Sequence, residues 1–198
     1  MPHREKKGEI LMQLRKLILT ALFTALTFVA TFFIKVPTPT MGYIHPGDAF
    51  VLLAGIFLGP LYGGFAAGFG SMLSDLAGGY LLYAPATFII KAAVAALVHP
   101  ALFRLEKLSG RQNHLLPVIS GSILSEILMI LGYFAYEIFL LAFTATSSLT
   151  NASLSSGIAA AASGIPFNVI QAAFGVVLVA VLYPILLPLW KKNQATVS

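Results

Sequence analysis

Long runs of apolar residues alternate with short polar segments along almost the whole chain. Six runs can be distinguished, at residues 17–34, 49–58, 61–76, 84–103, 115–143 and 167–190. A helix needs about 20 apolar residues to cross the hydrocarbon core of a bilayer, and most of the runs reach or approach that length. The pattern therefore predicts an all-α fold: an integral membrane bundle of six transmembrane helices, forming one domain over residues 1–198.

The second run is much shorter than the others. Residues 49–58 make a helix of only about 15 Å at 1.5 Å per residue, whereas the hydrocarbon core is about 30 Å thick. Either this helix is short and shielded by its neighbours, or residues 48–76 form a re-entrant hairpin. We favour six helices, with four helices plus a hairpin as the alternative.

Charged side chains are too few to cover a soluble protein. Only 10% of the 198 residues are charged, against roughly 25% in average soluble domains. The basic residues gather at one set of helix ends, and only Lys35 lies on the opposite side. By the positive-inside rule, both termini and the 104–114 connection are predicted to be cytoplasmic, so the net charge of +5 indicates topology rather than a nucleic-acid partner. The basic residues concerned are Arg4, Lys6, Lys7, Arg15, Lys16, Arg104, Lys107, Arg111, Lys191 and Lys192.

This orientation assigns the two remaining polar segments to opposite sides of the membrane. Residues 1–13 are predicted to be a cytoplasmic N-terminal segment. Residues 144–164 are rich in Ser, Thr and Ala and carry no charge. We predict that they form a long extracellular loop, with room for a short surface helix.

Five ionisable residues interrupt the apolar runs, namely Asp48, Asp75, Lys91, Glu126 and Glu137. A charge at mid-membrane costs about 3 kcal/mol on insertion scales, so each of them needs a reason. Asp48 is expected to cap the second helix, and Asp75 is expected to lie at the membrane interface. Lys91 either contributes to a ligand site or neutralises Glu126, and both interpretations stay open.

Helical spacing groups some of these residues with other polar side chains. Glu126, Tyr133 and Glu137 follow one another at i, i+7 and i+11, so they share one stripe of the fifth helix. Asn168 and Gln171 share a face near the outer end of the last helix. The outer ends of the last three helices are therefore predicted to line one pocket that opens outward.

Enzyme and metal chemistry is not indicated by the sequence. The chain has no cysteine and its four histidines are scattered, with His45 expected in a loop, so no metal site or cofactor is expected. It has neither a phosphate-binding Walker loop nor a Gly-x-Ser-x-Gly turn. Glu126 and Glu137 lie about 16 Å apart along one helix, too far to act on one bond. The chain is not expected to be an enzyme.

Small residues are arranged for close helix packing. Ala21 and Ala25 form an Ala-xxx-Ala pair on the first helix, beside a stripe of threonines. Such pairs mark helix-contact surfaces, and here internal packing and docking to another protein are equally good interpretations. Glycines between residues 42 and 79 recur every four residues and predict close packing rather than a phosphate site.

The central part of the chain carries a family resemblance. Residues 42–50 (GYIHPGDAF), 59–64 (GPLYGG), 75–80 (DLAGGY) and 83–91 (YAPATFIIK) resemble the substrate-binding (S) subunits of energy-coupling factor (ECF) transporters. The resemblance extends over roughly residues 14–190. The sequence is most similar to the branch linked to hydroxymethylpyrimidine and vitamin B6 compounds, with riboflavin subunits nearby.

The resemblance implies a function, partners and a set of residues. S subunits lie in the prokaryotic plasma membrane, capture a vitamin from outside, dock through the first helix on a membrane T subunit and work with two ATPase subunits. They topple within the membrane to release the substrate inward. Ala21 and Ala25 are the implied docking residues. The implied substrate-binding residues are His45, Tyr80, Tyr83, Lys91, Tyr133, Glu137, Asn168 and Gln171.

Two other function classes are alternatives. A self-contained ion-coupled carrier would use Lys91 and the carboxylates of the 115–143 run, but the chain has no apparent internal inverted repeat. A membrane enzyme or a scaffold protein is the weakest alternative because the corresponding motifs are missing.

Overall fold

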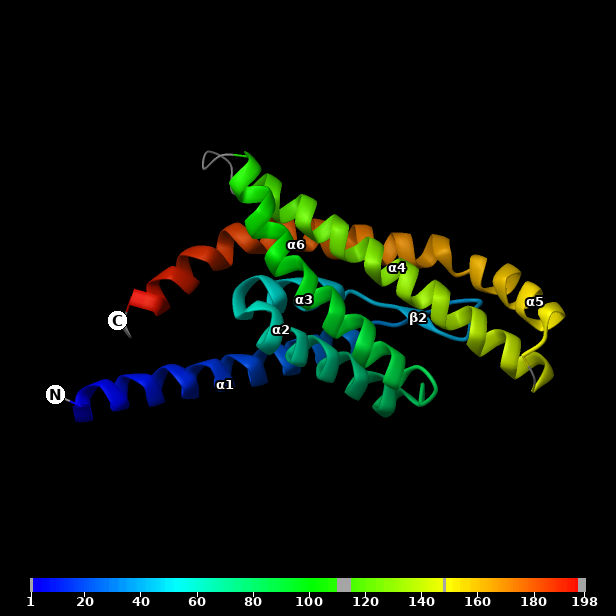
Figure 1. Cartoon of the computed structure of the whole chain (residues 1–198), viewed down its shortest axis with the longest axis horizontal. Coiled ribbons are helices and arrows are strands. Elements are labelled where there is room, and N and C mark those ends of the chain that lie inside the picture. Colours follow the sequence, from blue (N-terminus) through cyan, green and yellow to red (C-terminus); the bar gives the residue numbers. More distant parts are fainter. Residues whose placement is uncertain (1, 110–114, 148, 196–198) are drawn as a thin grey trace.

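The computed structural model describes the backbone over residues 2–109, 115–147 and 149–195. Within these ranges the chain is almost entirely helical, which confirms the all-α prediction (Figure 1). Arg111, and with it part of the 104–114 connection, lies outside the described residues, as do the side chains of Arg4, Lys6 and Lys7. The elements are α1 (Pro2–Phe33), β1 (Val36–Pro37), β2 (Tyr43–Ile44), α2 (Asp48–Gly78), α3 (Ala84–Ser109), α4 (Leu115–Thr146), α5 (Asn151–Ala162) and α6 (Ile165–Ala195).

Five of the described helices are long and apolar enough to cross a membrane. The sequence-based count is six because it treats residues 49–58 and 61–76 separately, whereas the structure joins them in α2. The helix is broken at Gly59, whose φ of 81° and ψ of 179° are not helical, and Pro60 follows. Only glycine adopts such a conformation readily. The candidate spans are Ile10–Phe33, Asp48–Gly78, Ala84–Leu108, Leu115–Ala145 and Ile165–Lys192.

The two limbs of α2 fold back on each other. A Cβ atom added to Gly63 would lie 2.5 Å from the carbonyl oxygen of Ala54, although nine residues of straight helix would separate the two by about 13 Å. Figure 1 shows the chain reversing direction at this bend. Val51 and Leu53 of the first limb have no exposed surface. Residues 48–78 therefore form a helical hairpin whose short first limb is shielded by its neighbours.

Close packing around this hairpin depends on glycine. A Cβ at Gly55 would collide with the carbonyl group of Ala95 on α3, and one at Gly70 would lie 2.6 Å from the carbonyl oxygen of Thr24 on α1. Backbones approach this closely only where side chains are absent. The predicted packing role of the small residues between 42 and 79 is confirmed at these positions.

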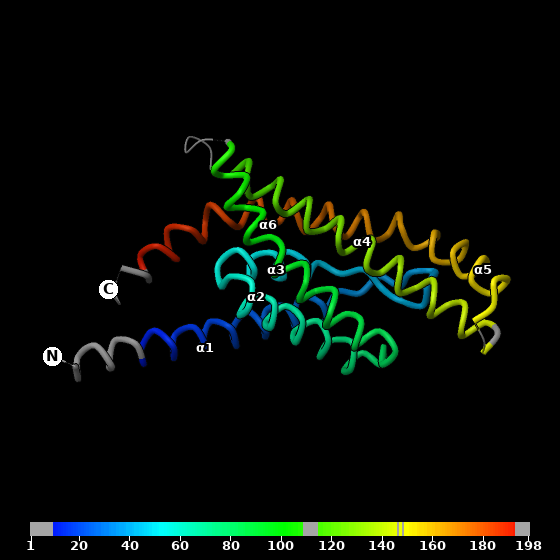
Figure 2. The backbone as a smooth tube through the Cα atoms, in the orientation of Figure 1, coloured from blue at the N-terminus to red at the C-terminus, as the bar shows by residue number. Residues whose placement is uncertain are grey.

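The chain passes back and forth along the bundle, as the tube in Figure 2 shows, and both termini lie at the same end. Helix α5 lies at the opposite end, within the 144–164 segment, and packs on α4. A Cβ at Gly157 would lie 2.5 Å from the carbonyl oxygen of Ile138. Thr150 caps α5 by accepting a hydrogen bond from the backbone N–H of Ser153.

Candidate functional site

The structure contains a small polar cavity. It is enclosed by the β1–β2 ribbon, the end of α2, the start of α3 and the facing sides of α4 and α6. Its volume of about 20 Å³ accommodates about one water molecule. The lining residues are Thr38, Gly42, Tyr43, His45, Asp75, Tyr83, Thr87, Tyr133, Glu137, Asn168 and Gln171.

Most of the residues expected to bind substrate come together at this cavity. Those in its lining are His45, Tyr83, Tyr133, Glu137, Asn168 and Gln171. Tyr80 and Lys91 lie outside the lining; the ring of Tyr80 packs on that of Tyr43, with 4.5 Å between centroids. The lining residues not expected from the sequence are Thr38, Gly42, Tyr43, Asp75 and Thr87.

The β1–β2 ribbon closes the cavity from outside the bundle. Its strands pair antiparallel, with Val36 opposite Ile44. Tyr43 on the ribbon is held by Lys35, whose Nζ atom lies 4.4 Å from the centre of the phenol ring. Lys35 also donates a hydrogen bond to the backbone carbonyl of Ser74 on α2 at 3.3 Å. These contacts fasten the ribbon to the end of α2.

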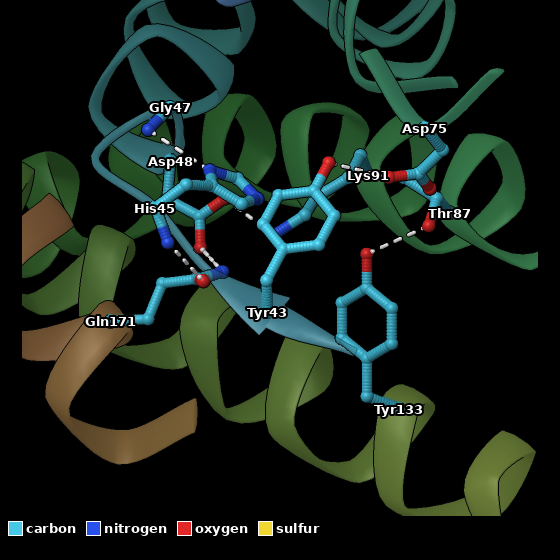
Figure 3. Close-up of polar contacts among 9 residues, drawn as sticks. All are labelled: Tyr43, His45, Gly47, Asp48, Asp75, Thr87, Lys91, Tyr133 and Gln171. Carbon is cyan, nitrogen blue, oxygen red and sulfur yellow. Dashed lines mark hydrogen bonds and ion pairs between the residues drawn. The ribbon is translucent and has the colours of Figure 1, made fainter. Parts of the chain in front are cut away.

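Asp75 is part of the cavity wall. It is only 3% exposed. The sequence predicted an interfacial position, and the structure shows its side chain buried in the lining of the cavity. Tyr43 donates a hydrogen bond to its Oδ1 atom at 2.6 Å, whereas Oδ2 is buried with no hydrogen-bond partner among the described residues (Figure 3). Beside it, Tyr133 donates to Thr87 at 3.1 Å. The cost of a charge in an apolar run was the sequence signal for Asp75, but its burial depends on the ribbon.

Glu137 forms a second acidic wall of the same cavity. Thr40, at the tip of the ribbon, donates a hydrogen bond to Oε1 at 2.7 Å. The hydroxyl of Tyr83 donates to the backbone carbonyl of Thr40 at 2.5 Å and lies 3.2 Å from the same Oε1 atom. The Oε2 atom is buried and has no hydrogen-bond partner among the described residues. Burial raises the pKa of the Tyr83 phenol, so Tyr83 stays a hydrogen-bond donor at neutral pH.

The side-chain amide of Gln171 links the ribbon to α2. Its Oε1 atom accepts a hydrogen bond from the backbone N–H of His45 at 2.9 Å, and its Nε2 atom donates to Oδ2 of Asp48 at 2.7 Å (Figure 3). The Nδ1 atom of His45 accepts from the N–H of Gly47 at 3.1 Å. Burial lowers the pKa of the His45 imidazole to about 3. His45 is therefore neutral at physiological pH.

Asp48 and Lys91 form an ion pair, and neither side chain has any exposed surface. The capping role expected for Asp48 is wrong, because Gly47 is the N-cap of α2 and no side chain caps it. Asp48 is instead the first residue of the helix, and its carboxylate meets Lys91 on α3. The ring centre of Tyr133 lies 5.2 Å from the Lys91 ammonium.

Of the two open interpretations of Lys91, neutralisation of Glu126 is not what the structure shows, because Lys91 pairs with Asp48. The Glu126 side chain is 2% exposed, and neither carboxyl oxygen has a hydrogen-bond partner among the described residues. Glu126, Tyr133 and Glu137 all lie on α4, as predicted. Of the three, Tyr133 and Glu137 line the cavity. Spacing along one helix fixes the face and leaves the partner on another helix undetermined.

The cavity wall is acidic. Asp75 and Glu137 line it, whereas Lys and Arg are missing from its described lining. No group of three His, Cys, Asp or Glu side chains able to hold a metal ion occurs among the described residues. The cavity is thus suited to a ligand that brings hydrogen-bond donors or positive charge.

The Ala21–Ala25 pair lies on the surface of α1. Both alanines are exposed and line an open apolar groove of about 790 Å³ between α1 and α2. Thr20 and Thr27, from the neighbouring stripe of threonines, are buried. Internal packing therefore uses part of the threonine stripe and leaves the alanine pair uncovered.

Comparison with known proteins places the chain among membrane transport components. The family model for the ECF-type riboflavin transporter, S component, matches residues 11–187. A solved structure described as the S component of a bacterial ECF transporter has a TM-score of 0.60 at 22% sequence identity. The structural match covers 90% of this chain and 99% of the solved chain. At this identity the likeness establishes the fold alone.

One curated protein is also similar. It is an uncharacterized protein in the gap 3' region of Pyrococcus woesei, 36% identical over 106 residues. The matched stretch covers 53% of this chain and 66% of that protein, just under two thirds of its length.

Proposed function

The chain belongs to the family of ECF-type riboflavin transporter S components, and from this membership we propose that it captures a small vitamin or vitamin precursor for import. It is a multi-pass membrane protein of the cell membrane. In the proposed cycle it binds its substrate from outside, docks on a T subunit through the face that bears Ala21 and Ala25, and depends on two ATPase subunits for energy. Both termini and the 104–114 connection are proposed to be cytoplasmic.

The proposed substrate is a compact nitrogen heterocycle of the hydroxymethylpyrimidine or vitamin B6 type. One observation carries this proposal: Asp75 and Glu137 line the same cavity, and each has a buried carboxyl oxygen without a partner among the described residues. Such oxygens are costly to bury unless a ligand donates to them. An amino group or a protonated ring nitrogen supplies donors of this kind.

The other lining residues would hold the ring. Tyr83 and Tyr133 offer aromatic faces, and Asn168 offers an amide for the heteroatoms of the ligand. Gln171 already uses its amide on His45 and Asp48, so we assign it to holding the ribbon in place. Lys91 is similarly occupied by Asp48, and we assign it to the support of the site rather than to the ligand.

Riboflavin is the second candidate substrate, because the matching family model is named for riboflavin transporters. The cavity volume of about 20 Å³ is too small for either ligand, so binding of either one requires the β1–β2 ribbon to move. A single ring requires a smaller displacement than the three fused rings of a flavin.

Calorimetric titration of the purified chain with hydroxymethylpyrimidine, pyridoxine and riboflavin tests the proposal. We expect tight binding of one of the first two without any partner subunit. Asn168→Ala should weaken binding, whereas Asn151→Ala, on the exposed side of α5, should not. Tight binding of riboflavin alone would refute the single-ring assignment. Unchanged affinity in both Asn168→Ala and Glu137→Ala would place the pocket elsewhere.

Reconstitution into vesicles separates this function from an ion-coupled carrier. A carrier would take up substrate without partner subunits, and uptake would stop when the ion gradient collapses. The proposed S subunit should transport nothing until the T and ATPase subunits and ATP are added.

A further inference from the structure

A second apolar groove runs between α1 and α6, on a different face of α1 from Ala21 and Ala25. It has a volume of about 370 Å³ and only apolar side chains in its described lining. The lining residues are Leu19, Leu22, Phe23, Leu26, Phe50, Leu53, Phe57, Leu182, Leu186, Leu189 and Trp190. Because Leu19, Phe57 and Trp190 also line a smaller cavity of about 110 Å³, the two hollows adjoin.

The smaller cavity is basic, and Arg15 and Lys16 belong to its lining. The guanidinium carbon of Arg15 lies 5.9 Å from the ring centre of Trp190, and Nζ of Lys16 lies 5.8 Å from that of Tyr62. The Nε and Nη2 atoms of Arg15 are buried, with no hydrogen-bond partner among the described residues. A buried guanidinium edge of this kind needs an acceptor, and Asp and Glu are missing from the described lining.

The combined hollow has the dimensions of one lipid leaflet. Trp and Tyr are enriched where the hydrocarbon core meets the headgroups, so Tyr62 and Trp190 place Arg15 and Lys16 at headgroup depth. From Arg15 to Leu26, at the far end of the groove, α1 rises about 16 Å. That is roughly half of a 30 Å hydrocarbon core. A single acyl chain entering at Arg15 would end at Leu26.

We infer that this groove binds an anionic phospholipid, with one acyl chain between α1 and α6 and the phosphate on the free edge of Arg15. Lys16 adds a second positive charge, which favours a headgroup with net negative charge over a zwitterionic one. The site is separate from the cavity beneath the β1–β2 ribbon, and the inference does not depend on the identity of the transported substrate.

Native mass spectrometry of the full chain in an equimolar mixture of phosphatidylglycerol and phosphatidylcholine with identical acyl chains tests the inference. We expect one phosphatidylglycerol to remain bound in preference to phosphatidylcholine. Arg15→Gln should lower that preference about fivefold, as expected for one basic residue at a lipid surface. Arg104→Gln, which removes an exposed charge near the end of α3, should leave it unchanged. Leu22→Trp should block the groove and reduce retention, whereas Ile18→Trp, on α1 outside the groove lining, should not.

Three results would overturn the inference: equal retention of the two lipids, an undiminished preference in Arg15→Gln, or retention in Leu22→Trp equal to that in Ile18→Trp. Inorganic phosphate separates a lipid from a simple ion. Displacement of the bound lipid by millimolar phosphate would show that the site binds a simple anion, and would refute the role of the groove. Thermal unfolding of each variant, with the wild-type chain as reference, identifies any variant that fails to fold. Arg15→Lys then serves as the substitute, and it should keep the preference.

Discussion

The carboxylate of Asp48 and the ammonium group of Lys91 form a fully buried ion pair that joins the start of α2 to α3. The pair contacts the cavity lining through Gln171, which donates to Asp48 and accepts a hydrogen bond from the backbone of His45 next to the β1–β2 ribbon. It therefore supports the site from within the bundle.

Removing one partner of this pair should strongly destabilise the fold. Lys91→Met leaves the Asp48 carboxylate buried without a cation, and we expect a loss of about 3–5 kcal/mol in unfolding free energy. The double variant Asp48→Asn with Lys91→Met should recover part of this loss. Unfolding in detergent measures both. Lys107→Met, at an exposed position on the same helix, is the control, and a loss as large as that in Lys91→Met would contradict the explanation.

Glu137→Gln should weaken substrate binding while leaving the fold intact. The amide retains an acceptor for Thr40 but removes the charge, and a hydrogen bond to a charged group contributes about 1.5–3 kcal/mol. We expect an affinity loss of roughly 10–100-fold, measured by titration of the purified chain. Glu126→Gln changes a carboxyl group that is buried but absent from the cavity lining, so its affinity should be near that of the wild type. Equal losses in the two variants would remove the special role of Glu137.

The stability of the protein should fall as the pH drops from about 6.5 toward 3, in part because of His45. In the folded chain its pKa is lowered to about 3 by burial, which outweighs the opposing effect of Asp48, whereas in the unfolded chain it is near 6.5. Only the unfolded state binds the proton within this window, so protonation favours unfolding. Thermal unfolding between pH 7.5 and 4.5 should show a smaller decrease in His45→Gln than in the wild type. Parallel curves for the two proteins would show that His45 makes no contribution.

Tryptophan at both positions of the Ala21–Ala25 pair should block assembly and spare substrate binding. The two indoles would fill the groove between α1 and α2 that the alanines leave open. Co-purification with the T and ATPase subunits measures assembly. Leu131→Trp adds the same bulk at an exposed position on α4, outside this groove, and should assemble normally. Retained assembly of the double variant would refute the docking role.

The sidedness of the bundle can be tested by single-cysteine labelling, because the chain has no cysteine of its own. Ser155→Cys on α5 and Lys107→Cys on α3 both place a thiol at an exposed position. In intact cells, a membrane-impermeant maleimide should label Cys at position 155 and not at position 107. Labelling in the reverse pattern would invert the proposed orientation.

Much of the helical architecture could be predicted from hydrophobicity. The 84–103 and 115–143 runs begin at the same residues as α3 and α4. The polar 104–114 connection precedes the second of these runs, and the Gly78-Gly79 pair separates the first from the run before it. The break at Gly59-Pro60 falls between two of the predicted runs. The β1–β2 ribbon could not be predicted in this way, since strands of two residues have no measurable periodicity.

The sequence could predict which helix faces line the candidate site. It could not predict which side chains pair with one another between helices. Tyr133, Glu137, Asn168 and Gln171 reach the cavity because helical spacing fixes which side of α4 and α6 they occupy. The partner of Lys91 is a tertiary property. Asp48 lies 43 residues away in the chain, and nothing local distinguishes it from Glu126. The burial of Asp75 in the cavity wall could not be predicted either, because the ribbon that buries it is itself a tertiary feature.

In the proposed function, the ribbon over the cavity would also determine how fast ligand is exchanged. Thr40 at its tip bonds to Glu137, and Tyr43 on β2 bonds to Asp75, so both fastenings must open before a molecule can pass. An association that waits for a conformational change is slower than free diffusion would allow. The residence time of a captured molecule is then set by the same opening. A protein at low external substrate concentration benefits from this arrangement, because slow escape keeps the molecule in place until the transporter is assembled.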